Sequence, residues 1–194
     1  MAKRIGLFGG TFDPVHKGHQ SIAEAFLNSG FIDELWVLLT PYPPHKQTGN
    51  KASYEVRLEM LKAAFVGFKN LHIKTIENSL SKPSYSFFTI RYLKSQNPEY
   101  TFYFCMGEDS LAQFHQWKFY EEILNECALL VAERPGADHK DVEQKITEKT
   151  YFVEHTPLEV SSSHIKQKIK SGKPIDNDVP DSVSDIIEKE QLYS

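Results

Sequence analysis

A glycine pair and two histidines lie close together near the start of the chain. The segment reads Gly9-Gly10-Thr11-Phe12-Asp13-Pro14-Val15-His16-Lys17-Gly18-His19. It joins an apolar run at 4–8 to a stretch at 17–28 whose apolar residues have helical spacing. Glycines let a backbone approach a ligand closely, and the free N–H groups of a helix N-terminus attract anions. His16 and His19 can add hydrogen-bond donors or positive charge, so the segment predicts a phosphate site.

Other kinds of site were weighed for this segment. A zinc site is rejected, because His16 and His19 lack a nearby third ligand and both cysteines lie far off in the sequence. A Walker loop and a dinucleotide fingerprint are excluded, since Gly-x-Gly-x-x-Gly is absent. A plain strand, turn and helix with two exposed histidines is the structural alternative, and these residues alone leave it open.

Polar residues also follow or precede other predicted elements. Two prolines stiffen a loop that presents His45 and Lys46, and a rigid turn with a solvated basic tip is the structural alternative. Ser84 can cap a helix whose free N–H groups near Tyr85 would bind a carboxylate. A capped amphipathic helix explains the same residues without a ligand.

The second half of the chain adds three candidates. Asp109, just after an apolar run, could accept hydrogen bonds from ribose hydroxyls or lie near a metal-bound phosphate. Trp117 offers a flat face to a ring, although a large aromatic is more often part of a core. Arg134 ends a later apolar run, and its structural alternative is a solvent-exposed loop arginine.

A second anion cradle is predicted where a late helix begins. Ser161, Ser162 and Ser163 supply hydroxyls there, and Lys166 lies one turn inside. Serines at a helix start are usually only caps, so this signal is weak by itself.

Apolar runs that indicate strands alternate with stretches that indicate helices. Strands are predicted at 4–8, 34–39, 71–76, 101–106, 127–132 and 151–153, and helices at 17–28, 54–65 and 85–93. Strands apolar on both faces and separated by helices are typical of a covered parallel sheet. We expect an α/β fold: a Rossmann-like, doubly wound parallel sheet with helices on both faces and its site at the carboxyl ends of the strands. Residues 1–194 should form one domain, helical over about 160–194, with a final helix at 176–194.

The composition is that of an ordinary globular chain. Hydrophobic residues make up 40% and charged residues 25% of the 194 positions, and the formal net charge is −4. Without a basic block, a nucleic-acid polymer is not expected as a partner, and without a long apolar run neither is a membrane. Cys105 and Cys127 are expected to be buried, reduced thiols, which predicts a cytoplasmic protein. Whether identical chains associate stays open.

The segment at 9–19 resembles the signature of the nucleotidyltransferase superfamily that carries a His-x-Gly-His motif. The segments at 43–46, 83–89, 107–117, 134–136 and 161–166 resemble those of bacterial nicotinate mononucleotide adenylyltransferases. The resemblance implies that catalysis rests on His16, His19 and Lys46. It implies phosphate or nucleotide contacts at Gly9, Gly10, Thr11, Phe12, Gly18, Asp109, Arg134, Ser161, Ser162, Ser163 and Lys166. It implies acceptor contacts at His45, Tyr85, Thr89 and Trp117, where the tyrosine and the threonine would hold the pyridine carboxylate and the tryptophan would stack on its ring.

Three positions depart from the family pattern. Phe88 stands where the family commonly has Asp, which bears on acceptor selectivity. Lys166 replaces the usual Arg and Ser163 the usual Thr in the motif that grips the outer phosphates of ATP. Lysine keeps the charge but loses the bidentate geometry of arginine.

The resemblance implies transfer of adenylate from ATP to nicotinate mononucleotide, with Mg²⁺ as the cofactor. Nicotinate adenine dinucleotide and pyrophosphate would be the products, in one step of NAD synthesis. Two alternatives are kept. The acceptor could be nicotinamide mononucleotide, phosphopantetheine or another phosphate monoester, or the chain could be a nucleotide-binding regulator without catalytic activity.

Overall fold

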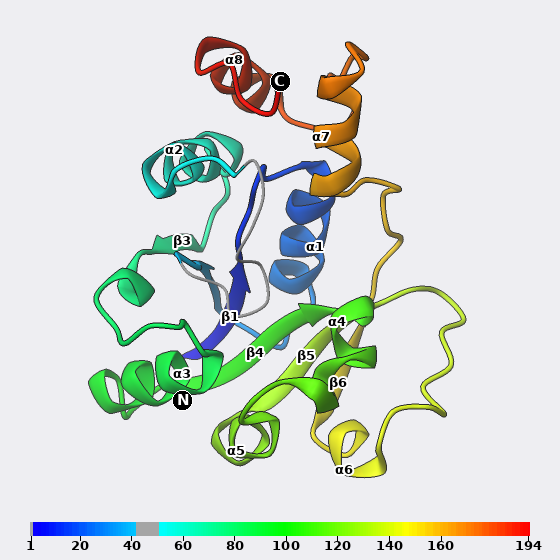
Figure 1. Ribbon diagram of the computed structural model, residues 1–194. Helices are drawn as coiled ribbons and strands as arrows, with labels where there is room; N and C mark the ends of the chain where they lie inside the picture. The colour runs from blue at the N-terminus through cyan, green and yellow to red at the C-terminus, as the bar shows by residue number, and fades with distance from the viewer. Residues whose placement is uncertain (1, 42–50) are drawn as a thin grey trace.

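Six parallel strands form one sheet at the centre of the molecule, in the order β3-β2-β1-β4-β5-β6 (Figure 1). The computed structural model describes residues 2–41 and 51–194. The strands are β1 (Arg4–Gly10), β2 (Glu34–Leu39), β3 (Leu71–Lys74), β4 (Thr101–Gly107), β5 (Ala128–Glu133) and β6 (Thr150–Glu154). Every neighbouring pair is parallel, which confirms the predicted doubly wound sheet.

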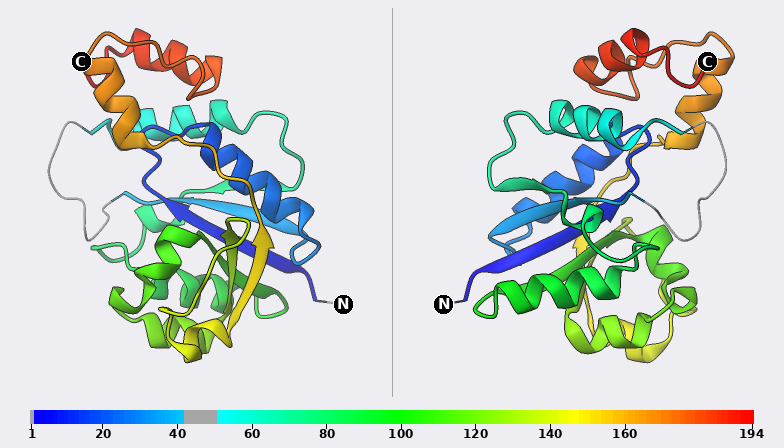
Figure 2. Two further views of the ribbon diagram at one scale, coloured as in Figure 1. Left: turned by 90° about the vertical axis from the view of Figure 1, so that its right-hand side faces the viewer. Right: turned by 60° about the vertical axis from the view of Figure 1, so that its left-hand side comes forward.

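Helices cover both faces of the sheet, as Figures 1 and 2 show. One face carries α1 (Lys17–Asn28), α2 (Tyr54–Ala64), α7 (Ser162–Lys170) and α8 (Asp181–Lys189). The other carries α3 (Ser86–Gln96), α4 (Glu108–Ala112), α5 (Tyr120–Glu126) and α6 (Gln144–Thr147). Two 3₁₀ turns, η1 (Ile76–Asn78) and η2 (Phe114–Gln116), complete the described elements.

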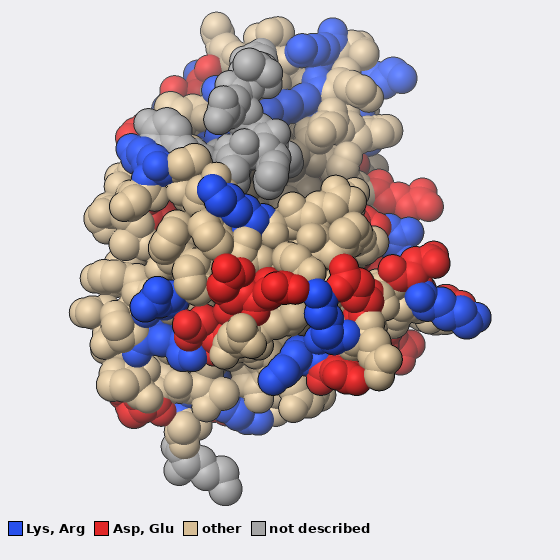
Figure 3. All heavy atoms as spheres, turned by 60° about the horizontal axis from the view of Figure 1, so that its bottom comes forward, with Lys and Arg blue, Asp and Glu red and all other residues tan. Residues whose placement is uncertain are grey.

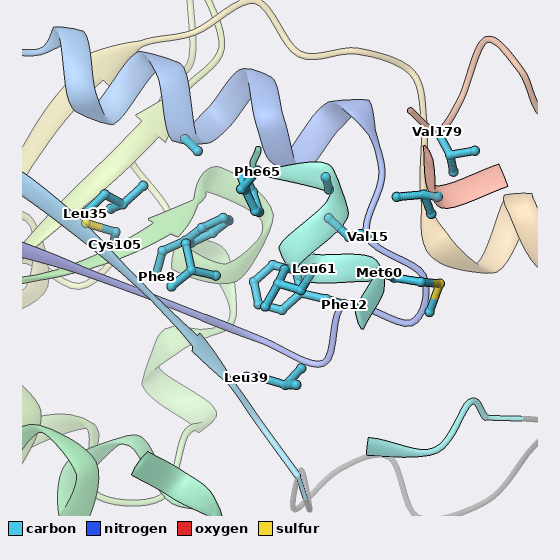
Figure 4. Packing of buried hydrophobic residues seen from close by; sticks show 14 of the residues in the cluster. Phe8, Phe12, Val15, Leu35, Leu39, Met60, Leu61, Phe65, Cys105 and Val179 are labelled. Carbon is cyan, nitrogen blue, oxygen red and sulfur yellow. The ribbon is translucent and has the colours of Figure 1, made fainter. Parts of the chain in front are cut away.

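Side chains of β1 enter the hydrophobic layers on both faces. Ile5 and Leu7 are fully buried in the layer shared with α3 and α5, whereas Phe8 is buried beneath α1 and α2. Figure 4 shows Phe8 packed beside Phe12 and Leu61, and the two phenylalanine rings meet edge to face at 5.7 Å. Burial on both faces explains why the strands read as nearly continuous apolar runs in the sequence.

The site is set by the point where the strand order reverses. From β1 the chain runs outward to β2 and β3, and it then returns to β4 on the opposite side of β1. In sheets of this kind the loops diverge at the carboxyl ends of the two strands, which leaves room for a ligand. The loops that follow β1 and β4 therefore face one another across the expected site.

The C-terminal helix is shorter than predicted. The expected helix at 176–194 is observed only as α8, because the preceding residues make other contacts. The carbonyl of Asp178 accepts the Lys17 N–H at 2.9 Å, and its carboxylate accepts Lys168 Nζ at 2.6 Å. Pro180 then precedes the helix, where its missing N–H is tolerated. The connection between α7 and α8 is thus docked on α1 rather than helical.

The short helices between β4 and β6 were not predicted. Helix α4 has 5 residues, α5 has 7 and α6 has 4. Hydrophobic periodicity is read over windows of about 11–18 residues, so helices this short leave no clear pattern.

The charged side chains on the lower face of the molecule are mixed in sign (Figure 3). Ion pairs of described residues include Lys145 with Glu121 at 2.6 Å and Lys94 with Glu126 at 2.8 Å. Cys105 and Cys127 are buried free thiols. None of the helices in the described part of the chain is long and apolar enough to cross a membrane.

Candidate active site

The loop between β1 and α1 begins later than the glycine pair suggested. Both glycines still belong to β1, where Gly9 pairs with Leu38 and Gly10 with Leu39. A Cβ on Gly9 would meet nothing within 4 Å, whereas a Cβ on Gly10 would lie 2.9 Å from the Phe12 ring. Gly9 therefore leaves room for a ligand to approach the backbone, but Gly10 makes room for a core side chain.

Phe12 supports this loop from the interior. Its backbone is left-handed, with φ of 46°, and its side chain is only 2% exposed. The predicted role of Phe12 as a phosphate contact can involve only its backbone, because its ring packs against Phe8 and His19. Packing of the ring compensates for a backbone conformation that costs about 1–3 kcal/mol in a non-glycine residue.

The two histidines predicted to be catalytic lie together at the start of α1. His16 is the N-cap residue and His19 lies in the first turn, and their ring centroids are 3.7 Å apart with planes inclined by 30°. The backbone N–H of His16 donates to Nδ1 of His19 at 3.2 Å. Because Nδ1 accepts this bond, a neutral His19 carries its proton on Nε2. His19 can therefore present an Nε2–H donor.

His16 contributes a neutral ring rather than a positive charge. Its side chain is buried, and burial lowers its pKa to about 4. Its Nδ1 is buried without a hydrogen-bond partner among the described residues. A Cβ on Gly18 would lie 2.9 Å from Val160 and 3.0 Å from this Nδ1, so only glycine lets the ring lie against the first turn.

Asp13, in the middle of the loop, is a buried acceptor that joins three separate segments. Its Oδ1 accepts the Tyr193 hydroxyl at 2.7 Å and the Ala52 N–H at 3.0 Å. Its Oδ2 pairs with Nζ of Lys166. The loop is thereby tied to α7, to the segment before α2 and to the end of the chain.

Arg57, which the sequence analysis did not single out, joins the loop after β1 to the loop after β2. Its side chain is 2% exposed, and Nη1 donates to the carbonyls of Thr11 at 2.7 Å and Thr40 at 3.0 Å. Its Nε donates to the carbonyl of Ala52 at 3.3 Å, and the Thr40 N–H donates to the carbonyl of Gly10 at 2.9 Å. The ends of β1 and β2 are thus held in a fixed relation.

Helical spacing could have identified this arginine. Positions 57, 60, 61 and 64 lie on one face of α2, and the last three hold Met60, Leu61 and Ala64. An arginine among apolar residues on a buried face must have hydrogen-bond partners, because an unpaired buried charge is very costly.

The serines at the start of α7 act mainly within the protein. The Ser161 hydroxyl accepts the His164 N–H at 3.2 Å as a helix cap, and the Ser162 hydroxyl donates to the carbonyl of Pro14 at 2.9 Å. Ser163 is exposed. The structure therefore brings α7 against the first loop, and a phosphate contact of these hydroxyls stays a prediction.

Asp109 and Arg134 meet at the carboxyl ends of β4 and β5. Nη2 of Arg134 lies 3.5 Å from Oδ2 of Asp109, and both side chains are largely exposed. The Arg134 N–H donates to Oε2 of Glu108 at 3.1 Å. Sequence alone placed these residues at one edge, and the structure shows that they form a pair.

One residue expected to bind the acceptor, Tyr85, lies in a group of aromatic rings where α3 begins. We call Tyr85, Phe87, Phe88 and Phe119 the aromatic cluster, because each ring lies 5.3–6.4 Å from at least two of the others in edge-to-face or tilted contacts. Nζ of Lys118 lies 5.0 Å from the centre of the Tyr85 ring. Phe88 is 43% exposed, so an apolar ring stands at the surface where the family commonly has Asp.

Two predicted acceptor contacts lie deeper than expected. Trp117 packs against Phe104 at 6.0 Å and Phe114 at 5.6 Å, so part of its ring belongs to the core. Thr89 is 1% exposed, and its hydroxyl donates to Oε1 of Glu77 at 3.1 Å. Burial raises the pKa of the Glu77 carboxyl. Contact of either side chain with an acceptor stays a prediction.

His45 and Lys46 lie outside the described residues. The ends of the segment that contains them are nevertheless placed, because Thr40 and Ala52 are both held by Arg57. The arrangement as a whole offers open backbone at Gly9, the His16–His19 pair with its neutral His16 ring, and the Lys166 ammonium on one side of the site. On the other side of the site it offers aromatic rings and exposed charged groups. The two sides together suit binding of a nucleotide phosphate beside a flat ring.

Comparison with known proteins agrees with this geometry. A family model described as cytidylyltransferase-like matches residues 7–168. The nicotinate-nucleotide adenylyltransferase of Bacillus subtilis is 35% identical over 191 residues, which is 98% of each protein.

Two solved structures share the fold. A nicotinic acid mononucleotide adenylyltransferase of Plasmodium falciparum complexed with NaAD has a TM-score of 0.82 at 22% identity, over 98% of this chain and 97% of that one. The same protein complexed with APC has a TM-score of 0.79 at 23% identity, again over 98% and 97%. The extent of the family model and the identity to the curated relative together show that this chain belongs to the cytidylyltransferase-like family, among the nicotinate-nucleotide adenylyltransferases.

Proposed function

We propose that this chain transfers adenylate from ATP to nicotinate mononucleotide, forming nicotinate adenine dinucleotide and pyrophosphate in NAD synthesis. The observation that carries the proposal is the close His16–His19 pair at the N-terminus of α1, beside the point where the strand order reverses. The name of the Bacillus subtilis relative supports the choice of acceptor. Small molecules, rather than polymers, are the partners that such a site accommodates.

The chemistry needs no general base from the protein. The acceptor phosphate is already largely ionised near pH 7, since the second pKa of a phosphate monoester is about 6. One of its oxygens attacks the α-phosphorus of ATP in line, a new P–O bond forms, and the bond to the bridging oxygen of pyrophosphate breaks. Catalysis then consists of positioning the reactants and stabilising charge on the phosphate oxygens.

Each described residue has a definite task in this proposal. The Nε2–H of His19 donates to the α-phosphate as charge builds there, and neutral His16 supports it through its backbone N–H and its tilted ring contact. Lys166 lies near the phosphates from α7, and we assign Lys46 to the departing pyrophosphate by its place in the motif. The open backbone at Gly9 lets a phosphate approach the loop.

Mg²⁺ is proposed as the cofactor that comes with ATP. This ion is usually held by one or two carboxylates together with substrate phosphates and waters. Asp109 fits such a role, because its carboxylate is exposed at the end of β4, whereas Asp13 is engaged by Tyr193 and Lys166. When bound, the ion neutralises phosphate charge.

Pyrophosphate release tests the function directly. The pure protein is incubated with ATP and Mg²⁺, first with nicotinate mononucleotide and then with nicotinamide mononucleotide. We expect release with the first and much less with the second. Equal release would mean that Phe88 has relaxed the acceptor site, and silence with both would favour another phosphate monoester or the non-catalytic regulator.

A further inference from the structure

The second-last residue of the chain is buried against the first loop. Tyr193 is 2% exposed and belongs to the hydrophobic layer that includes Phe12 and Met60. Its backbone is left-handed, with φ of 66°, as is that of Gln191, with φ of 49°. Such conformations persist in non-glycine residues only where surrounding contacts enforce them, so the end of the chain is held in one place.

The Tyr193 side chain acts on two charged groups at once. Its hydroxyl donates to Oδ1 of Asp13 at 2.7 Å, and Nζ of Lys166 lies 4.7 Å from the centre of its ring. Burial and the adjacent Asp13 carboxylate raise the pKa of the tyrosine, so its hydroxyl keeps its proton and remains a donor.

The Asp13 carboxylate and a phosphate of ATP would compete for an ion pair with the Lys166 ammonium. A carboxylate that accepts further hydrogen bonds has its charge spread over more donors, and it attracts a neighbouring cation less strongly. Without the tyrosine hydroxyl, Asp13 would keep only the Ala52 N–H on Oδ1 and would hold Lys166 more tightly. Less of the lysine charge would then be available to a phosphate.

We infer that Tyr193 is a positioning residue for adenylyl transfer: its hydroxyl holds Asp13, and through Asp13 it sets how Lys166 and the β1–α1 loop receive ATP. This inference rests on the proposed function for its kinetic readout. Tyr193 is thereby part of the nucleotide site, although it lies far from the first loop in the sequence.

The test compares two tyrosines that make the same two kinds of contact, Tyr193 in a buried position and Tyr120 in a partly exposed one. Tyr120 also donates its hydroxyl to a carboxylate, Oε1 of Glu121 at 3.2 Å, and it also lies under a lysine, with Lys145 Nζ 4.9 Å from its ring centre. Each is changed to phenylalanine, which keeps the ring. We expect Tyr193→Phe to raise KM and Kd for ATP about tenfold, the size of one hydrogen bond to a charged group, with a smaller change in kcat. Tyr120→Phe should leave both within twofold of the wild type.

A double-variant cycle separates positioning from general loss of structure. In an Asp13→Asn background the carboxylate is absent, so adding Tyr193→Phe should change the Kd for ATP by less than twofold. A tenfold effect in that background, or no effect of Tyr193→Phe in the wild type, would overturn the inference. Direct titration with ATP keeps the test valid even if the wild type releases no pyrophosphate, an outcome that would defeat the proposed function instead.

Discussion

The two sides of the site are built from different interactions. On the nucleotide side, hydrogen bonds hold the loop after β1. Arg57 and Ser162 donate to its carbonyls, and the Tyr193 hydroxyl and the Ala52 N–H donate to the Asp13 carboxylate. On the acceptor side, the aromatic cluster and Lys118 meet through ring contacts. Hydrogen bonds fix direction, whereas ring contacts allow tilting and sliding at little cost. The fixed side therefore suits the reacting phosphates, and the adaptable side suits recognition of a flat ring.

The two sides also differ in how much rate and stability a single substitution should remove. A buried polar network is costly once one member is removed, because its partners are left unsatisfied in a medium of low dielectric constant. Exposed aromatic and cationic contacts are individually weak. Substitutions on the nucleotide side should therefore impair rate and stability far more than those on the acceptor side.

The largest effect is expected from His19, which we propose as the donor to the α-phosphate. His19→Ala should lower kcat by about 10²–10³, the usual cost of one transition-state donor, while KM for ATP changes less. His72→Ala is the matched control, because His72 lies on the edge strand β3 and is exposed. Single-turnover measurement of pyrophosphate release gives the rate. Near-normal turnover of His19→Ala would remove this residue from the mechanism.

The next effect concerns stability and compares two arginines, one on each side. Arg57→Met leaves the carbonyls of Thr11 and Thr40 without this donor, so the free energy of unfolding should fall by about 3 kcal/mol. Arg91→Met, by contrast, removes an exposed guanidinium that lies 5.5 Å from the centre of the Phe87 ring, and should cost less than about 0.5 kcal/mol. Urea unfolding of both variants provides the comparison. Equal losses would contradict the distinction between the two sides.

A third effect is a pH dependence of stability that arises at His16. Its pKa is about 4 in the folded protein, below the ordinary value of 6.5, because burial disfavours the charged ring. Between these values the unfolded chain binds the extra proton, so this contribution is complete above pH 6.5 and is lost as the pH falls toward 4. The full contribution of His16 to the free energy of unfolding is roughly 3 kcal/mol.

A His16→Asn variant isolates the contribution of His16 to the pH dependence of stability. Its free energy of unfolding should fall less steeply than that of the wild type between pH 6.5 and 4, as measured by urea titration at several pH values. Parallel curves for the two proteins would mean that His16 is already accessible to protons in the folded state. In the wild type, kcat should show no transition from His16 above pH 6, since the ring stays neutral there.

Sequence patterns predicted the strands of the sheet and the longer helices. The helix at 17–28 and the strand at 34–39 have the predicted bounds, because the helix shows a clear period and the strand is a nearly continuous apolar run. The motif residues at 9–19 are brought to the carboxyl end of β1, as expected. The short helices around α5 were missed because they span too few residues to show a period. The connection before α8 was missed because Asp178 is held by Lys17, which is distant in the sequence.

Local periodicity and the order of the elements were enough to predict the sheet, its covered faces and the placement of the histidine motif. The folded structure was needed to show that His16 is neutral, that Gly10 makes room for Phe12, and that Arg57 and Tyr193 support the loop. Burial and hydrogen-bond partners set these properties, and residues up to 180 positions apart supply them. No local sequence pattern predicts which distant side chain will donate a hydrogen bond to the β1–α1 loop.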